Sequence, residues 1–296
     1  RDGRMSLSHA LNTRGGVHSE FTIVRESADS FYLVSAGALQ RLDHDYLLKH
    51  MPRDGSVQFQ DLTSAMGVLV IAGPKSRELL SRVSRDDFSN AGFPWLSARP
   101  VVVGMAPCLA ARVNFVGEMG WELHHPMEFQ NHIFDTLMEA GADLPIKPFG
   151  IRAMNSLRLE KSYRLIGTEL SIEYSADESA LQRFVHADKG DFLGRDGLLA
   201  WRARGAAWQF STLEVHGVKD ADALGNNPIL LDGRTVGRAT GGGYGFRLGK
   251  SLALAMIEPA HAAVGTALEI EILGERYAAT VLPESPFDPS NARLRG

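Results

Sequence analysis

Apolar and polar residues in the first two thirds of the chain follow two different spacings. Apolar residues three and four apart predict helices, whereas short runs that alternate or stay apolar predict strands. Helices are expected at 39–51, 75–83, 129–140 and 151–165. Strands are expected at 21–24, 31–34, 57–62, 68–74, 101–103, 110–115 and 122–125. The run 68–74 is apolar almost throughout, which is typical of a strand buried on both faces.

After Gly205 the pattern changes to short strands separated by glycine-containing turns. Six such strands are expected, at 210–215, 228–231, 235–239, 252–257, 268–272 and 277–282. Regularly spaced short strands are typical of a β-barrel or a sandwich. We therefore predict an α+β fold with a domain boundary near Gly205 and a β domain at the C-terminal end.

Composition narrows the classes of function. The 296 residues favour two or three modules, and a net charge of -4 without a basic stripe argues against nucleic acid as a partner. Cys108 is the single cysteine, which excludes an internal disulfide and predicts a reducing, cytoplasmic location. No apolar run approaches the roughly 18 residues that would cross a membrane, so no membrane partner is expected.

Two segments resemble cofactor or metal motifs without completing them. The glycine-rich run 241–245 precedes a further strand rather than a helix, so we interpret it as a loop of the β domain and expect no FAD or NAD site. His124 and His125 are adjacent, which places them on opposite faces of a strand, so they do not readily chelate one ion. No metal site is predicted.

A glycine pair near the start of the chain carries the first candidate for chemistry. Gly15 and Gly16 predict a tight turn, because glycine adopts positive φ without steric cost. Glu20 follows at the entrance of the next strand, where its carboxylate could face a ligand. The alternative is a solvated charge at a strand end, and spacing alone favours this alternative.

A second candidate is the stretch 112–122, which has the pattern of a strand, a glycine turn and a strand. Glu118 and Glu122 flank the turn, beside the aromatic residues Phe115 and Trp121. A flat heteroaromatic ligand such as a pterin needs a stacking face and a carboxylate for its N–H edge. The alternative is two surface glutamates and two aromatic core residues.

Arg152 is placed at the start of the helix expected over 151–165. There its guanidinium could meet the carboxylate of a ligand or an acid of the protein itself.

Six stretches together resemble the folate-binding aminomethyltransferases, the family of the glycine-cleavage T-protein. They follow the family's order at 12–24, 68–80, 112–123, 149–161, 189–198 and 236–257. The chain is most similar to the C-terminal half of dimethylglycine and sarcosine dehydrogenases and the matching oxidases, which carry a flavin domain ahead of this module. The resemblance implies an excised or truncated member that lacks the flavin domain and the first part of the module.

The resemblance also implies a fold. The family has three lobes in a cloverleaf, with tetrahydrofolate in a central funnel. Here a ferredoxin-like lobe would span 1–59, the remainder of the folate-binding lobe 60–205, and the C-terminal β-barrel 206–296.

Site residues follow by matching motif positions. The family's essential carboxylate matches Glu20, where the family typically has aspartate, and its pterin-binding glutamate matches Glu122. The aromatic residue seven positions earlier is Phe115 here and usually tyrosine in the family. A pocket arginine matches Arg152. The strand that borders the folate matches 33–36, including Val34 and Ser35.

The implied activity is transfer of a one-carbon unit to tetrahydrofolate, giving 5,10-methylenetetrahydrofolate. Glu20 would be the catalytic residue, and the expected partners are a folate, a one-carbon donor and either a flavin domain or a lipoyl carrier protein. Glu20 is one methylene longer than aspartate, and a shift of about 1 Å at a reacting group can cost on the order of 100-fold. Two alternatives therefore stay open: a non-catalytic folate-binding module, and a folate-dependent O-, S- or N-demethylase.

Overall fold

The computed structural model describes residues 1–296, which form two compact units. The first contains Arg1–Ser6, Thr22–Phe149 and Ser290–Gly296, and the second contains Leu7–Phe21 and Gly150–Pro289. The boundary runs through the first two strands, so each of them contributes residues to both units.

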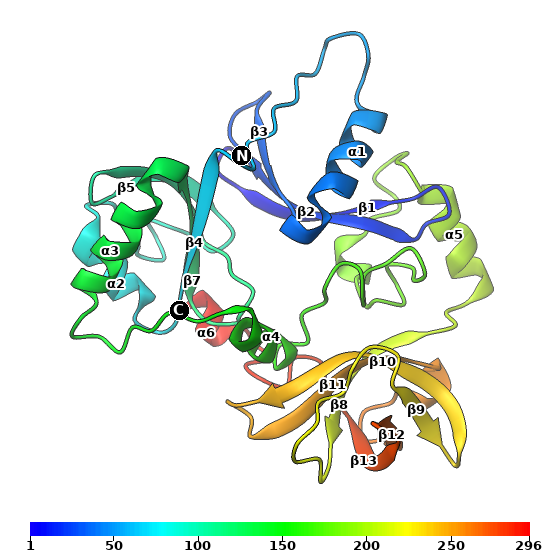
Figure 1. Ribbon diagram of the computed structural model, residues 1–296. Helices are drawn as coiled ribbons and strands as arrows, with labels where there is room; N and C mark the ends of the chain where they lie inside the picture. Colours follow the sequence, from blue (N-terminus) through cyan, green and yellow to red (C-terminus); the bar gives the residue numbers. More distant parts are fainter. The chain divides into compact units, whose positions relative to one another are not determined.

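The first unit is built on a four-stranded antiparallel sheet of order β4–β7–β6–β5. The strands are β4 (Met66–Ala72), β5 (Ala98–Val103), β6 (Ala106–Ala111) and β7 (Gly120–Pro126). Two helices, α2 (Ser76–Val83) and α3 (Gln130–Ala140), pack together on one face of this sheet (Figure 1). Their apolar residues close a core that contains Leu80, Trp121 and Ile133.

The N-terminal strands form a second, three-stranded sheet of order β1–β2–β3. Its strands are β1 (Met5–Leu11), β2 (Val17–Arg25) and β3 (Phe31–Val34). Thr22 to Arg25 pair with β3, as the alternating sequence predicts. Helix α1 (Gln40–His50) follows, and α6 (Ala292–Arg295) ends the chain.

The second unit contains a closed six-stranded barrel of order β10–β11–β8–β13–β12–β9. Its strands are β8 (Gln209–Val215), β9 (Pro228–Leu231), β10 (Arg234–Gly245), β11 (Lys250–Ile257), β12 (Ala267–Ile272) and β13 (Glu275–Leu282). All six predicted strands are present, and the choice between barrel and sandwich is settled as a barrel. Closure leaves no unpaired strand edge.

The glycine run 241–245 was predicted as a loop, and this prediction is wrong. It forms the last part of β10, against which helix α4 (Ile151–Leu159) packs (Figure 1). A Cβ atom at Gly245 would lie 2.9 Å from Cγ of Glu160, and one at Gly243 would lie 3.1 Å from Cδ1 of Leu159. Gly243 and Gly245 therefore allow the end of α4 and the residue after it to approach the barrel closely.

Four other expectations need correction. The strand expected at 110–115 instead spans 106–111, because the side chain of Asn114 holds the residues that follow in a loop. Residues 57–62 form no strand. Strand β4 lies at the edge of its sheet with Val68 44% and Val70 41% exposed, so it is not buried on both faces. Helix α4 ends at Leu159 rather than at 165, because Glu160 to Ser162 turn away into a buried polar network.

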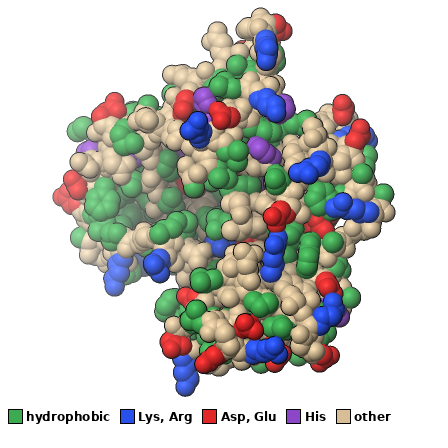
Figure 2. All heavy atoms as spheres, turned by 45° about the vertical axis from the view of Figure 1, so that its right-hand side comes forward, with side chains coloured by type: hydrophobic (Ala, Val, Ile, Leu, Met, Phe, Trp, Pro, Cys, Tyr) green, Lys and Arg blue, Asp and Glu red, His purple; other side chains and the backbone are tan.

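Charged side chains are mixed over the surface. On the face shown in Figure 2, lysine and arginine side chains are interspersed with aspartate and glutamate. No helix is both long enough and apolar enough to span a membrane.

The boundaries expected between the three lobes, at 59/60 and 205/206, stay a prediction.

Candidate functional site

The Gly15–Gly16 turn that precedes Glu20 is fixed by its neighbours. The side-chain oxygen of Asn12 accepts hydrogen bonds from the backbone N–H groups of Arg14, at 2.9 Å, and Gly16, at 3.1 Å. Gly15 has a φ of 84°. A Cβ atom at Gly16 would lie 2.5 Å from the carbonyl oxygen of Ile172, so this glycine is required for space. The turn connects β1 to β2 and sets where the following residues point.

Glu20, on β2, is held by a buried histidine. Nε2 of His9, on β1, lies 2.9 Å from Oε2 of Glu20. The His9 side chain is 1% exposed and the Glu20 side chain 25% exposed, so the carboxylate lies at the margin of the interior. Nδ1 of His9 is buried without a hydrogen-bond partner. Glu20 is therefore not a freely solvated strand-end charge, although its catalytic role stays a prediction.

Strand β7 separates its residues into two groups by alternation. Trp121 is fully buried and packs edge-on against Phe88 and Phe93, with ring centroids at 5.5 and 6.1 Å. Glu122 points away from that core and is 23% exposed. The idea that Trp121 could offer a stacking face is wrong, because its ring is part of the core.

Glu122 is the end of a hydrogen-bonded series of three side chains. Its Oε2 lies 3.3 Å from Nε2 of His124, which is 2% exposed and two residues further along β7. Nδ1 of the same ring lies 3.2 Å from the hydroxyl of Tyr32 on β3. Burial raises the pKa of the Tyr32 phenol, and the carboxylates of Glu26 and Glu122 raise it further.

Phe115 lies in the loop between β6 and β7 and is half-buried. Asn114 shapes this loop: its side chain accepts hydrogen bonds from the N–H groups of Val116 and Gly117 and donates one to the carbonyl of Glu118. The Glu118 carboxylate lies 3.6 Å from Arg293. The two glutamates of this stretch thus differ, since one pairs with an arginine and the other with a histidine.

Val34 and Ser35 lie at the end of β3 and are both half-buried. Val34 pairs with Thr22 in the sheet. Tyr32 is two residues before Val34 on the same strand. The strand matched to the folate border therefore also supplies the hydroxyl group that contacts His124.

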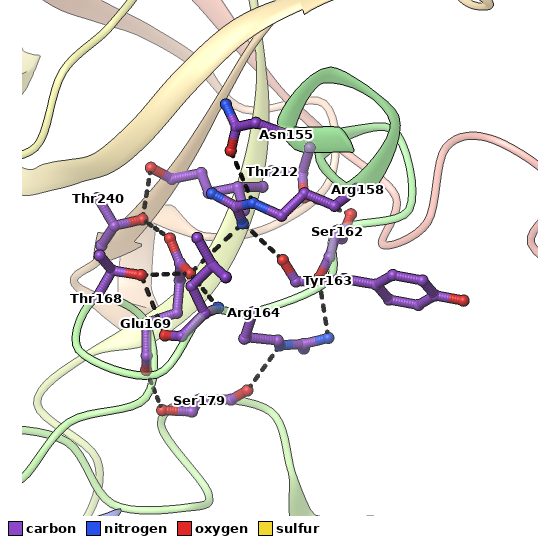
Figure 3. Close-up of polar contacts among 12 residues, drawn as sticks. Asn155, Arg158, Ser162, Tyr163, Arg164, Thr168, Glu169, Ser179, Thr212 and Thr240 are labelled. Carbon is purple, nitrogen blue, oxygen red and sulfur yellow. Dashed lines mark hydrogen bonds and ion pairs between the residues drawn. The ribbon is translucent and has the colours of Figure 1, made fainter. Parts of the chain in front are cut away.

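Arg152 lies in the first turn of α4 and is exposed. The far end of α4 is fixed by a buried network, shown in Figure 3. Arg158 donates to Asn155 at 2.9 Å and to the carbonyl of Tyr163 at 2.7 Å, and lies 3.7 Å from Glu169. Burial lowers the pKa of the Arg158 guanidinium, and the Glu169 carboxylate opposes that shift.

Glu169 joins this network to the barrel. Its carboxylate accepts hydrogen bonds from the N–H of Leu165, at 2.8 Å, and from the hydroxyl of Thr168, at 2.8 Å. It also accepts one from Thr240 on β10. Ser162, just past α4, pairs with Thr212 on β8 at 2.7 Å. The network fixes the helix that carries Arg152 against two barrel strands.

The predicted site residues fall into two groups. Glu122, Phe115, Val34 and Ser35 belong to the first unit, and Glu20 and Arg152 belong to the second. No hydrogen bond or ion pair joins Glu20 to Arg152. Sequence reasoning missed His9, His124 and Tyr32. Only His124 left a signal, because a residue two positions from Glu122 on a strand shares its face.

The family of the chain follows from its match to two family models. One, described as the GCVT N-terminal domain, matches residues 1–189, and the other, described as the glycine cleavage T-protein C-terminal barrel domain, matches 209–288. The chain belongs to the glycine-cleavage T-protein family. The resemblance inferred from six sequence stretches is thereby confirmed, and the barrel lies within the second match.

The chain covers very different shares of the relatives that it resembles. The chain is 33% identical over 297 residues to mitochondrial dimethylglycine dehydrogenase of Homo sapiens, covering 99% of the chain and 34% of the relative. It is 34% identical to the formaldehyde-forming 4-methylaminobutanoate oxidase of Paenarthrobacter nicotinovorans, covering 97% and 34%. An aminomethyltransferase of Caldanaerobacter subterraneus is 27% identical, with 96% and 75% covered.

A solved structure shows the same fold. The glycine cleavage system aminomethyltransferase T of Bartonella henselae aligns with a TM-score of 0.84 over 98% of this chain and 77% of that chain, at 20% identity. The chain spans about a third of the length of the dehydrogenase and oxidase relatives. The match thus supports a fold of the aminomethyltransferase type.

Proposed function

We propose that this chain binds tetrahydrofolate and captures on it the one-carbon unit of a methylated amine, giving 5,10-methylenetetrahydrofolate. A separate demethylating enzyme or domain first oxidises the amine to an iminium or formaldehyde equivalent, and the capture then releases the demethylated amine or water. The observation that carries the proposal is that two partly exposed carboxylates, Glu20 and Glu122, are each held by a buried histidine. Both are residues that the resemblance in sequence had matched to the family's motifs. The dehydrogenase and oxidase names of several relatives support a methylated amine as the source of the carbon.

The residues fit a reduced folate by the chemistry of their donors and acceptors. Only Oε2 of Glu122 is hydrogen-bonded within the protein, so its other oxygen can accept from the N–H edge of a pterin. Phe115 offers a half-buried ring for packing against a flat heterocycle. Arg152 is exposed and charged, which suits a carboxylate of the folate tail. Val34 and Ser35 would border the ligand.

Glu20 suits a role in proton transfer. When bound, the reduced folate supplies the nitrogens N5 and N10 that accept the one-carbon unit. Oε2 of Glu20 is occupied by His9, which leaves Oε1 to hold or accept the proton that N10 loses. A positioned general base typically contributes 10²–10⁴-fold to a rate.

Calorimetry with tetrahydrofolate tests the binding half of the proposal. We expect Glu122→Ala to weaken binding at least about tenfold, because a charge-assisted hydrogen bond to the ligand is lost. Glu118→Gln is the matched control, since it removes the neighbouring carboxylate that pairs with Arg293. Absence of binding by the wild type, or equal binding by Glu122→Ala, would contradict the assignment.

Product analysis tests the transfer half. The chain is supplied with tetrahydrofolate and with a methylated amine plus the enzyme that oxidises it. Formation of 5,10-methylenetetrahydrofolate above the uncatalysed rate supports the proposal. Formation of 5-methyltetrahydrofolate would instead favour an O- or S-demethylase, and binding without turnover would favour a non-catalytic folate-binding module.

A further inference from the structure

Three polar side chains of the first unit are connected in series and end at the proposed pterin-binding carboxylate. Tyr32 contacts His124 at 3.2 Å, and His124 contacts Glu122 at 3.3 Å. The phenol ring also packs edge-on against the imidazole, with centroids 5.5 Å apart and planes at 88°. The imidazole is therefore held from two directions at once.

The chemistry of these groups allows one direction of donation when the histidine is neutral. An ionised carboxylate only accepts hydrogen bonds, so Nε2 of His124 must carry the proton that is donated to Glu122. Nδ1 is then an acceptor, and the Tyr32 hydroxyl must donate to it. This order requires a protonated phenol, and burial, Glu26 and Glu122 all raise the pKa of Tyr32.

The series differs from the other buried histidine on the same strand. His125 is fully buried, its Nδ1 lies 3.0 Å from the carbonyl oxygen of Pro126, and its Nε2 has no partner. It contacts neither candidate carboxylate and packs beside Gly67. Only one of the two adjacent histidines is thus connected to a group that faces outward.

We propose that Tyr32 and His124 are positioning residues that orient Glu122 for the ligand. The N–H group at Nε2 of His124 donates to Oε2, which leaves Oε1 for the N–H edge of the bound heterocycle and limits rotation of the carboxylate. A carboxylate held in this way loses less conformational freedom on binding than a free one. This inference rests on the proposed function, because it assigns Glu122 to the ligand.

The first test concerns the free protein and needs no folate. Nitrogen-15 NMR of the imidazole groups should show His124 with the proton on Nε2. Replacing Tyr32 by phenylalanine should shift the Nδ1 resonance and leave His125 unchanged. A proton on Nδ1 in the wild type, or an Nδ1 resonance that does not respond to Tyr32→Phe, would overturn the proposal.

The second test compares two ligands. Tyr32→Phe should raise the dissociation constant of tetrahydrofolate about fivefold and His124→Leu about tenfold or more, since each removes one link of the series. Neither should change the affinity for p-aminobenzoylglutamate, which lacks the pterin ring. A general loss of folding would weaken both ligands equally, and that result would contradict a positioning role.

Two variants complete the design. His124→Gln should recover most of the affinity, because its amide can donate to Glu122 and accept from Tyr32. His125→Gln should lower stability and leave the ratio of the two affinities unchanged.

If Glu122→Gln itself does not change the affinity for tetrahydrofolate, the proposed function fails. If Glu122→Gln weakens binding and Tyr32→Phe and His124→Leu do not, only the present inference fails.

Discussion

The two units each contain a carboxylate held by a buried histidine, and the two pairs are alike in burial. His9 is 1% and His124 2% exposed, while Glu20 is 25% and Glu122 23% exposed. In both, Nε2 of the imidazole contacts Oε2 of the carboxylate. In each pair the buried imidazole holds one carboxylate oxygen, and the other oxygen has no hydrogen bond to the protein.

The pairs differ at the second nitrogen of the imidazole. Nδ1 of His124 accepts from Tyr32, whereas Nδ1 of His9 has no partner. For this buried Nδ1, remaining an unused acceptor costs less free energy than becoming an N–H group without a partner. The proton of a neutral His9 is therefore favoured on Nε2 as well. Each carboxylate is held by one histidine, but only His124 is itself held by a second side chain. Under the proposed function this difference suits separate tasks: a fixed histidine keeps Glu122 in place for binding, whereas Glu20 can adjust while a proton moves.

The largest effect is expected for Glu20 itself. Glu20→Ala should lower the rate of one-carbon transfer by about 100-fold or more, because it removes the proposed proton acceptor. Asp196→Ala, which removes an exposed acid of α5 (Arg195–Arg204), is the control. Steady-state product formation measures both. Unchanged turnover by Glu20→Ala would return Glu20 to a structural charge.

Loss of His9 should have a smaller effect of the same kind. His9→Ala releases the Glu20 carboxylate, and misplacement by about 1 Å can cost up to 100-fold, so we expect a reduction in turnover of roughly tenfold. His9→Gln should recover part of it, since an amide can also donate to Glu20. His18→Ala on the same hairpin serves as the control. Equal loss in the alanine and glutamine variants would show that His9 acts through packing alone.

The turn before Glu20 should matter for stability. Gly16→Ala places a Cβ atom 2.5 Å from a backbone oxygen, and such overpacking typically costs about 1–3 kcal/mol of unfolding free energy. Gly37→Ala is the matched control, because no atom lies within 4 Å of the Cβ added there. Denaturation with urea measures the difference. Similar values for the two variants would mean that the turn relaxes without cost.

The smallest expected effect is a change in stability at alkaline pH, which should distinguish the His124–Glu122 pair from the His9–Glu20 pair. Because the pKa of Tyr32 is raised in the folded state, its contribution to stability is fully present below pH 10 and is lost as pH rises through the folded-state pKa. The stability difference between wild type and Tyr32→Phe should therefore shrink above pH 10. The stability difference between wild type and His9→Gln should not shrink in this way, because both proteins contain Tyr32. Thermal denaturation of the three proteins across pH 8 to 11 measures it.

Local sequence patterns were sufficient for most elements of the fold. The six barrel strands follow from short alternating runs between glycine turns, and most helices from apolar spacing. The failures arise from tertiary contacts. Gly243 and Gly245 allow α4 to approach β10, and no local pattern distinguishes such glycines from those of a loop. Val68 and Val70 are exposed because β4 lies at a sheet edge, which depends on strand order rather than on sequence.

The candidate site was predicted in part. Matching motif positions singled out the carboxylates Glu20 and Glu122, whose roles stay predictions, but not the histidines that hold them. Tyr32 and His124 are 92 positions apart, so their hydrogen bond depends on how two sheets meet. Trp121 could have been assigned to the core, because it is adjacent to Glu122 on a strand and must face the other way.

The central claim is that the two carboxylates perform different tasks, and dissociation constants of tetrahydrofolate for Glu20→Gln and Glu122→Gln test it most directly. Both variants keep the size of the side chain and remove its charge. The account predicts weaker binding by about tenfold or more for Glu122→Gln, and a value within about twofold of wild type for Glu20→Gln. Equal dissociation constants for the two variants, or the reverse order, would contradict the division of tasks.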